Sequence, residues 1–169
     1  IYAKYSESEN RKLKYIKGIN KKMSKIKIAI LDTGIDMSHP GLEKYKGSVK
    51  KFIRTEAGFT SAEDENTDNQ FGHGSGVSAI ILRMKNDVEL FVFKVFDDTL
   101  VSNIDTINDA LEYIERNIDC KIIQMSFGVR NFNAQLKENC ERLAAKGIII
   151  ISAFDNGGSV SYPAALDCV

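Results

Sequence analysis

Asp32 and His73 are the two residues whose types and surroundings could do chemistry together. Asp32 directly follows an apolar run over residues 26–31, so it lies where a buried strand is expected to end. His73 stands between two glycines, just before a segment with helical periodicity. A histidine can take a proton from a nucleophile near neutral pH, and a carboxylate can fix its tautomer. The pair therefore predicts two members of a charge-relay site.

The third member of such a site would be a nucleophilic serine, and the sequence offers no serine with the required surroundings. Ser75 is too close to His73 along one helix to give up its proton productively. Ser159 and Ser161 lie far downstream, but no motif there would present a nucleophile. We therefore expect the 169 residues to hold a relay without its nucleophile.

Alternating strands and helices are expected to position these residues. Apolar runs predict strands over residues 26–31, 88–96, 121–125 and 148–153, and the last three runs are nearly continuous. Such runs are typical of parallel strands that are covered on both faces. Helical periodicity predicts three helices: one over residues 74–84, one that begins after an N-cap at Ser102, and one over residues 133–146. The order predicts an α/β fold, a parallel sheet with helices on both faces.

Polar or glycine-rich groups follow each of the four predicted strands. These groups are Asp32, then Asp97 and Asp98, then Ser126, Phe127 and Gly128, and finally Asp155 and Asn156 with two glycines. In open α/β sheets the chemistry lies at the carboxyl ends of the strands. We therefore expect these groups to gather at one edge of the sheet.

Six segments in series resemble motifs of the subtilisin-like serine protease family (subtilases, peptidase S8). They are residues 32–36, 73–78, 93–96, 125–128, 152–156 and 161–164, in the family's order. The resemblance runs from Ile26 to Val169 and implies a subtilisin-like three-layer domain. The family's serine lies in a Gly-Thr-Ser-x-Ala motif after Tyr-Pro-Ala, and this sequence contains no Gly-Thr-Ser. We therefore expect a truncated domain whose nucleophile follows Val169.

The resemblance also implies a role for each site residue in a serine endopeptidase that acts on peptides or proteins. Asp32 would orient His73, which would act as general base and then as general acid. Asn156 would donate a hydrogen bond in the oxyanion hole. A substrate backbone would bind along a channel segment made of Ser126, Phe127 and Gly128. The family usually has glycine where this chain has Asp155, so a left-handed backbone is expected there.

Other interpretations of the same residues stay open. Residues 32–34 also resemble the aspartic-protease triplet, although a second triplet and an all-β pattern are missing. Asp32 and Asp36 could instead hold Mg²⁺ beside phosphate, but residues 71–76 match a phosphate loop poorly. We expect Asp36, Asp97 and Asp98 to be surface carboxylates, and we expect no metal and no cofactor. The main alternative is a non-catalytic subtilisin-like domain that binds peptides or partners, which the missing serine and Asp155 favour.

The composition restricts the partners and the number of domains. The chain is 43% hydrophobic, with 23 lysines and arginines against 23 aspartates and glutamates. Such a chain can form one globular core, and its balanced charge gives no reason to expect nucleic acid or a membrane as partner. We expect a basic N-terminal arm or upstream extension over residues 1–24 and a partial peptidase domain over residues 25–169.

The cysteines and the truncation lead to two further expectations. Cys120, Cys140 and Cys168 are an odd number at wide spacing, which predicts free thiols in a reducing compartment and favours the cytoplasm. A truncated domain would leave part of its sheet uncovered. We therefore expect self-association, or a partner that covers that face.

Overall fold

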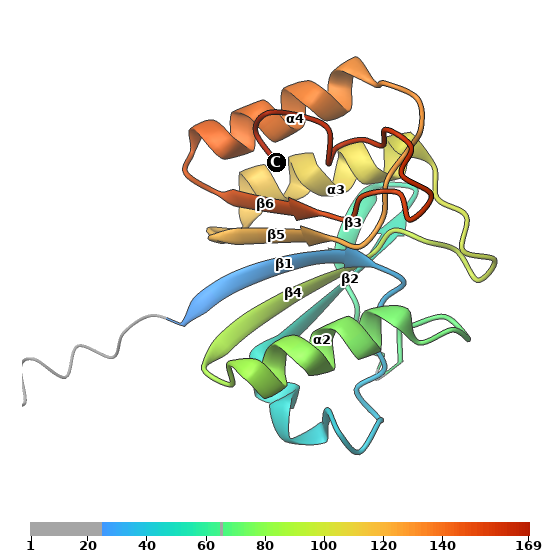
Figure 1. Ribbon diagram of the computed structural model, residues 1–169. Coiled ribbons are helices and arrows are strands. Elements are labelled where there is room, and N and C mark those ends of the chain that lie inside the picture. The colour runs from blue at the N-terminus through green and yellow to red at the C-terminus, as the bar shows by residue number, and fades with distance from the viewer. Residues whose placement is uncertain (1–24, 65) are drawn as a thin grey trace, which may run out of the picture.

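A six-stranded sheet in the order β3-β2-β4-β1-β5-β6 forms the centre of the computed structural model (Figure 1). Residues 25–64 and 66–169 are described, so the arm expected over residues 1–24 lies outside the described residues. The strands are β1 Ile26–Asp32, β2 Val49–Thr55, β3 Gly58–Ser61, β4 Val88–Lys94, β5 Ile122–Met125 and β6 Ile149–Ser152. Neighbouring strands are parallel except β2 and β3, which are antiparallel. The predicted α/β fold is confirmed, and the sheet is mixed rather than wholly parallel.

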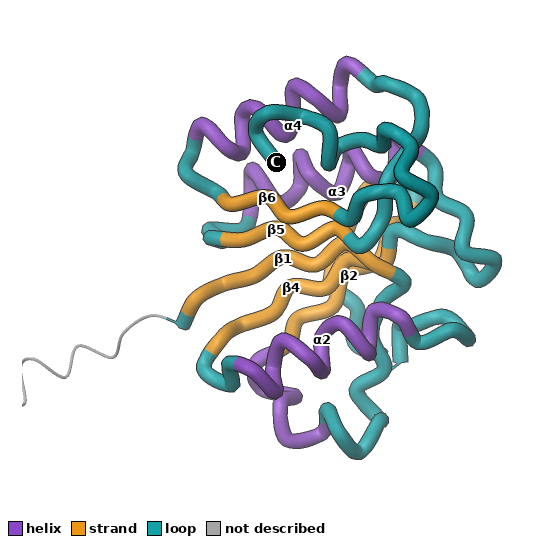
Figure 2. Tube along the Cα trace, viewed as in Figure 1, coloured by secondary structure: helices purple, strands orange, loops and turns teal. Residues whose placement is uncertain are grey.

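Helices lie on both faces of this sheet, as the sequence predicts. Helix α2, His73–Met84, packs on one face, whereas α3, Ile104–Asn117, and α4, Ala134–Ala145, pack side by side on the other (Figure 2). A short 3-10 helix, η1, spans Glu43–Ser48. The result is the three-layer arrangement that the sequence predicts.

Strand β1 shows why the sheet has a core on each face. Ala29 and Leu31 belong to the apolar cluster beneath α3 and α4, whereas Ile28 and Ile30 belong to the cluster beneath α2. Successive side chains of a strand point to opposite faces, so a continuous apolar run buries both faces. β1 is therefore a central strand, fixed from both sides up to Asp32, its last residue.

Strands β2 and β3 are absent from the sequence prediction. The sequence of β2 is rich in basic residues, and only its Phe52 is buried. In β3 only Phe59 is buried. β3 is an edge strand and β2 lies next to it, and each has one fully buried side chain, so they lack the apolar run that marks a central strand.

The N-cap of α3 and the end of β4 are among the predicted boundaries that differ from the structure. The N-cap of α3 is Asn103, whose side chain accepts a hydrogen bond from the backbone of Asp105. Ser102, the predicted cap, instead donates its hydroxyl proton to the carbonyl oxygen of Val95 at 2.5 Å. The second predicted strand ends at Lys94, so residue 96 lies beyond β4 in the loop.

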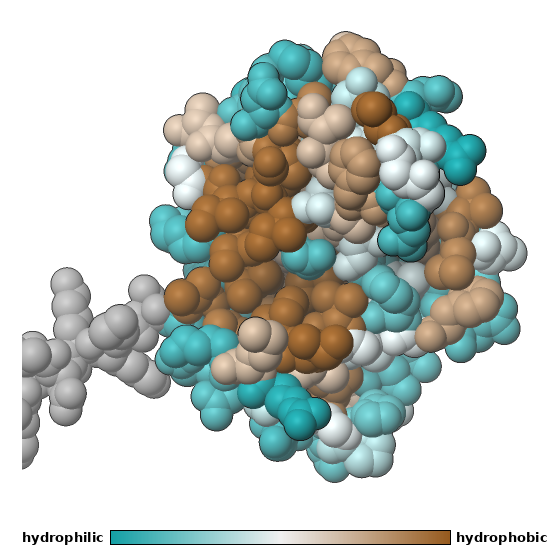
Figure 3. Space-filling view, in the orientation of Figure 1, coloured by the Kyte–Doolittle hydropathy of each residue, from teal (hydrophilic) through white to brown (hydrophobic). Residues whose placement is uncertain are grey.

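One part of the sheet is left uncovered on the α2 side. α2 lies over β1 and β4, whereas Ile149 and Ile151 in β6 are 60% and 46% exposed. Figure 3 shows apolar side chains gathered on this face, between α2 and β6. No helix of the described residues has the length and apolar character needed to cross a membrane.

Candidate functional site

The end of β1 and the start of α2 bring Asp32 and His73 into contact. Nδ1 of His73 lies 2.8 Å from Oδ1 of Asp32, and the backbone N–H of Thr33 donates to the same oxygen at 2.8 Å. The Asp32 side chain is 2% exposed and the His73 side chain is 52% exposed. The carboxylate is therefore shielded from water, while one edge of the imidazole remains accessible.

The second oxygen of the Asp32 carboxylate is unusual. Oδ2 is buried and has no hydrogen-bond partner among the described residues. A buried carboxylate oxygen without a partner costs free energy, and such atoms often mark functional positions. An ionised Asp32 in this environment would strongly stabilise a positive charge on the imidazole of His73.

Glycines place the start of α2 against the turn that follows β1. Gly72 precedes the helix with a φ of 65°, in the left-handed region that glycine favours. A Cβ atom on Gly74 would lie 2.0 Å from the carbonyl oxygen of Gly34. Only glycine at residue 74 lets the two backbones approach so closely. The position of His73 relative to Asp32 is therefore set by direct backbone packing.

An apolar cavity of about 410 Å³ lies beside the pair. Its lining residues are Asp32, Thr33, Phe71, His73, Phe96, Leu100, Ser126 and Phe127. The rings of Phe96 and Phe127 meet edge to face, with centroids 5.2 Å apart. A mostly apolar cavity with a few polar groups at one end is typical of a site that binds an apolar side chain and orients it.

The structure brings four of the predicted site residues to this cavity: Asp32, His73, Ser126 and Phe127. Gly128 and Asn156 do not line it. Leu100, which has a φ of 60° without being a glycine, also lines the cavity and is absent from the predicted site residues. Its loop carries no motif, so no sequence signal connects Leu100 with the site.

Gly128 and Asp155 are held together by one buried serine. Ser161 is 2% exposed, and its hydroxyl oxygen accepts a hydrogen bond from the backbone N–H of Asp155 at 3.1 Å. A Cβ atom on Gly128 would lie 2.9 Å from Cβ of Ser161, so a larger residue would displace it. The Ser152 hydroxyl also donates to the carbonyl oxygen of Phe127 at 3.0 Å. The channel segment and the loop that bears Asn156 are therefore one connected unit.

Asn156 is exposed in a tight turn after β6. The side chain of Asp155 accepts a hydrogen bond from the N–H of Gly157 at 2.6 Å. The backbone carbonyl oxygen of Asp155 accepts one from the N–H of Gly158 at 2.9 Å. The expectation of a left-handed backbone at Asp155 is wrong, because Leu100 alone has a positive φ among the described non-glycine residues. The turn places that conformation at Gly158, with a φ of 77°.

The serines near His73 have other hydrogen-bond partners. The Ser75 hydroxyl donates to Asp68 at 2.5 Å and accepts from the backbone of Asp36 at 2.8 Å. Ser126 lines the cavity, and its hydroxyl accepts a hydrogen bond from a glutamine side chain at 3.4 Å. Within residues 25–64 and 66–169, no hydroxyl group is hydrogen-bonded to Nε2 of His73.

The carboxylates considered for metal binding are bound to the protein itself. Asp36 accepts two hydrogen bonds from Ser38, and the bond from its hydroxyl lowers the pKa of the Asp36 carboxyl group. The Thr99 hydroxyl likewise lowers the pKa of Asp97 by donating to it. Asp98 pairs with a lysine of β4. The part of the chain that the structure describes contains no group of three His, Cys, Asp or Glu residues that could hold a metal ion.

Comparison with known proteins gives a consistent result. A sequence model of the subtilase family matches residues 23–169. Subtilisin DY of Bacillus licheniformis is 29% identical over 163 residues, which cover 88% of this chain and 56% of that protein. The subtilisin-like protease SBT6.1 of Arabidopsis thaliana is 32% identical over 143 residues, which cover 80% of this chain and 13% of that protein.

Solved structures show the same fold. Sphericase superposes with a TM-score of 0.61 at 27% identity, covering 85% of this chain and 51% of that one. The psychrophilic subtilisin-like protease Apa1 from Pseudoalteromonas sp. AS-11 has a TM-score of 0.69 at 20% identity, covering 85% of this chain and 34% of that one. The chain spans about half the length of the first bacterial relatives, or less.

Proposed function

This chain belongs to the subtilase family of serine proteases, and we propose that residues 25–169 are part of a subtilisin-like peptidase domain that cleaves peptide bonds. The observation that supports the proposal is the hydrogen bond between Asp32 and His73 at the mouth of an apolar cavity. A buried carboxylate that orients an accessible imidazole is the arrangement that activates a hydroxyl nucleophile.

In this mechanism Nδ1 of His73 keeps its proton and donates a hydrogen bond to the Asp32 carboxylate. Nε2 is then free to take the proton of a serine hydroxyl as the hydroxyl attacks the scissile carbonyl. The imidazolium that forms is stabilised by the buried Asp32 carboxylate. His73 then returns the proton to the leaving amine, which completes acylation.

We propose that the nucleophilic serine is supplied by polypeptide outside residues 1–169. Support comes from the sequence, which lacks a Gly-Thr-Ser segment, and from Nε2 of His73, to which none of the described hydroxyl groups is hydrogen-bonded. A serine in that position would complete the Asp, His, Ser order of the family.

The apolar cavity and the channel segment would hold the substrate. An extended peptide would pair with the backbone at Ser126 and Gly128, as an added strand pairs with a sheet edge. The Phe96 and Phe127 rings would then receive an apolar side chain of the substrate. Asn156 would donate a hydrogen bond to the oxyanion from the turn after β6.

A fluorophosphonate probe tests this function. Longer polypeptide that contains residues 1–169 and a downstream serine should be labelled, and His73→Ala should abolish labelling. His39→Ala is a matched control, because the His39 ring accepts a hydrogen bond from Gly41 within a turn and lies outside the pair. The 169-residue chain alone should show no turnover. Labelling that survives His73→Ala would contradict the mechanism, and a longer polypeptide without a reactive serine would favour the non-catalytic alternative.

We also propose that the uncovered face of β6 self-associates in the 169-residue chain. The exposed side chains of Ile149 and Ile151 are part of an apolar surface, which water disfavours. Light scattering should show a mass that rises with protein concentration. Ile151→Lys should return the chain to a monomer, whereas Val101→Lys, at an exposed residue elsewhere, should not. A wild-type monomer at every concentration would refute self-association.

A further inference from the structure

The N-terminus of α2, where His73 lies, is capped from outside the helix. Gly72 occupies the N-cap position and provides no side-chain cap. The N–H of Gly74 donates instead to the Thr33 hydroxyl oxygen at 2.9 Å, and the N–H of Ser75 donates to Oδ2 of Asp68 at 2.9 Å. The first turn of α2 therefore depends on two side chains that come from other segments.

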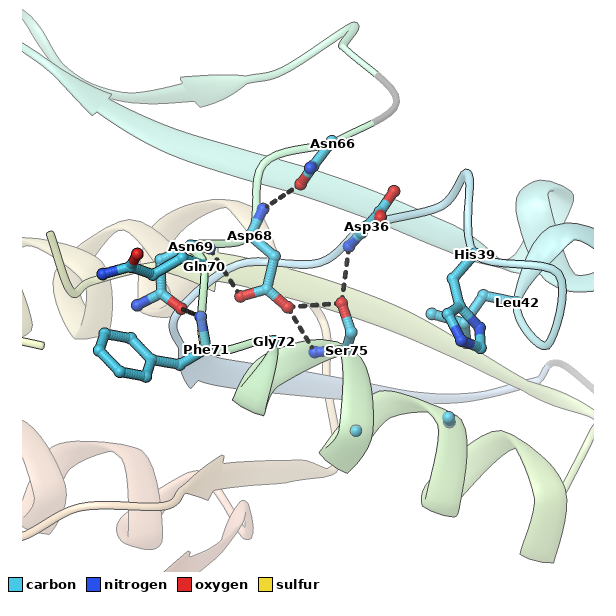
Figure 4. A pocket seen from close by; sticks show the side chains of 12 residues that line it. Asp36, His39, Leu42, Asn66, Asp68, Asn69, Gln70, Phe71, Gly72 and Ser75 are labelled. Carbon is cyan, nitrogen blue, oxygen red and sulfur yellow. Dashed lines mark hydrogen bonds between the residues drawn. The ribbon is translucent and has the colours of Figure 1, made fainter. Parts of the chain in front are cut away.

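The Asp68 carboxylate accepts four hydrogen bonds, and Figure 4 shows three of them. Oδ1 accepts from the Thr33 hydroxyl at 2.5 Å and from the N–H of Asn69 at 2.9 Å. Oδ2 accepts from the N–H of Ser75 at 2.9 Å and from the Ser75 hydroxyl at 2.5 Å. An ionised carboxylate has about four acceptor positions and no donor, so every acceptor position of Asp68 is occupied. The helix N-terminus also favours a negative charge there.

These bonds connect the two segments that carry the candidate catalytic pair. Thr33 is the residue after Asp32, and Ser75 lies two residues after His73 in the first turn of α2. A single carboxylate thus joins the end of β1 to the start of α2. The Ser75 hydroxyl extends the network by accepting the N–H of Asp36 at 2.8 Å.

We infer that Asp68 is a positioning residue for the Asp32–His73 hydrogen bond. It acts through Thr33 and Ser75. Among the described residues, Asp68 forms no hydrogen bond with Asp32 or with the His73 side chain. The inference deepens the proposed function, on which its catalytic meaning rests. A residue that merely stabilised the fold would change the free energy of unfolding and leave the imidazole of the folded protein as it was.

Nuclear magnetic resonance of the histidine rings distinguishes these two roles. The chain has two histidines, so ¹⁵N-histidine labelling gives two rings to assign. In the wild type we expect the neutral His73 ring to be held in the Nδ1–H tautomer by Asp32. In Asp68→Asn an NH₂ group replaces one carboxylate oxygen and its two acceptor positions. This NH₂ group would face N–H and O–H donors, with which it cannot form hydrogen bonds as a donor. We expect His73 in the folded variant to change to a mixture of tautomers and to lose its slowly exchanging Nδ1 proton.

Asp36→Asn is the matched control. Asp36 and Asp68 both line a second cavity, of about 380 Å³ (Figure 4), but the carboxylate of Asp36 binds Ser38 rather than α2. The control removes one negative charge from the same second cavity, and it should leave the His73 spectrum unchanged. A wild-type His73 spectrum in folded Asp68→Asn would overturn the inference, and so would equal changes in the two variants.

A second pair of variants decides the matter if Asp68→Asn does not fold. Thr33→Val removes the hydroxyl that joins Gly74 to Asp68, whereas Thr33→Ser keeps it. Tautomer mixing in the valine variant alone supports the inference, and identical spectra of the two refute it. These spectra require no turnover, so absence of fluorophosphonate labelling would refute the proposed function without deciding the role of Asp68. In an active polypeptide, Asp68→Asn should lower kcat by about 10- to 100-fold with KM nearly unchanged.

Discussion

The carbonyl oxygen of Gly34 lies 2.0 Å from the point where a Cβ atom on Gly74 would stand. The turn after β1 and the first turn of α2 therefore meet through backbone atoms. Gly34 itself has a φ of 107°, and a Cβ atom there would lie 2.2 Å from the carbonyl oxygen of Thr67. Because backbone atoms cannot change rotamer to relieve a clash, the contact between Gly34 and Gly74 sets how closely the segments that carry Asp32 and His73 approach each other.

Gly74→Ala should therefore destabilise the protein, whereas Gly76→Ala, in the same helix, should stabilise it. The first variant forces α2 away from Gly34 and should lower the free energy of unfolding by about 1–3 kcal/mol. Gly76 has open space at its Cβ position, so alanine there should raise that free energy by about 1 kcal/mol through helix propensity. Urea denaturation of both variants measures the difference. Changes of the same sign would contradict the role of the Gly34 contact.

Asp32→Asn should separate stability from catalysis. The asparagine oxygen can still accept the N–H of Thr33 and the Nδ1 proton of His73, while the buried negative charge is removed. Because a buried charge costs more free energy than a buried neutral amide, and Oδ2 of Asp32 has no partner among the described residues, we expect an unfolding free energy about 1 kcal/mol higher. In an active polypeptide kcat should fall by about 10⁴-fold, as in related relays. Thermal unfolding and turnover measure the two effects, with exposed Asp98→Asn as control. A clear loss of stability would contradict this account of Oδ2.

Asn156→Ala should impair turnover with little effect on folding. Asn156 is exposed in its turn, and the hydrogen bonds of that turn come from Asp155 and Gly158. We therefore expect the free energy of unfolding to change by no more than about 0.5 kcal/mol. In an active polypeptide kcat should fall by about 10²–10³-fold, a magnitude that is established for subtilisin itself. An unchanged kcat would remove Asn156 from the oxyanion hole and leave the Asp32–His73 pair unaffected.

The sequence predicts the central strands and the proximity of Asp32 and His73, for physical reasons. β1 buries both faces, so its residues form an apolar run that can be recognised without a structure. Asp32 ends that run, and the glycines on either side of His73 mark a close backbone approach. β2 and β3 bury one phenylalanine each, Phe52 and Phe59, and such a signal cannot be distinguished from a loop.

Asp68 shows what the sequence cannot predict. It lies in an acidic segment with several similar residues, such as Glu63 and Asp64, and nothing local distinguishes it from them. Its importance comes from contacts with Thr33, 35 residues away, and with Ser75, on a helix. Such a network depends on the tertiary packing of three segments, which no periodicity or spacing records.

Cys140 should make the protein sensitive to alkaline pH. Its thiol is fully buried, and burial raises its pKa from 9.0 to about 12. The folded state therefore keeps a proton that the unfolded chain loses above about pH 9. The resulting stability is present below that pH and should fall by up to about 1.4 kcal/mol per pH unit as the pH rises toward 12.

Urea denaturation at pH 8 and pH 10 tests this effect. Cys140→Ala should lower the unfolding free energy at pH 8 through the cavity that it leaves, but the further loss at pH 10 should be smaller than in the wild type. Cys168→Ala is the comparison, because Cys168 is only partly buried and its charge is a smaller cause than burial of the raised pKa of Cys140, so this variant should reduce the alkaline loss less than Cys140→Ala does. Parallel pH dependences of the wild type and Cys140→Ala would mean that other groups cause the alkaline loss. A loss of pH dependence that is larger in Cys140→Ala than in Cys168→Ala would assign the alkaline destabilisation to the buried Cys140 thiol of α4.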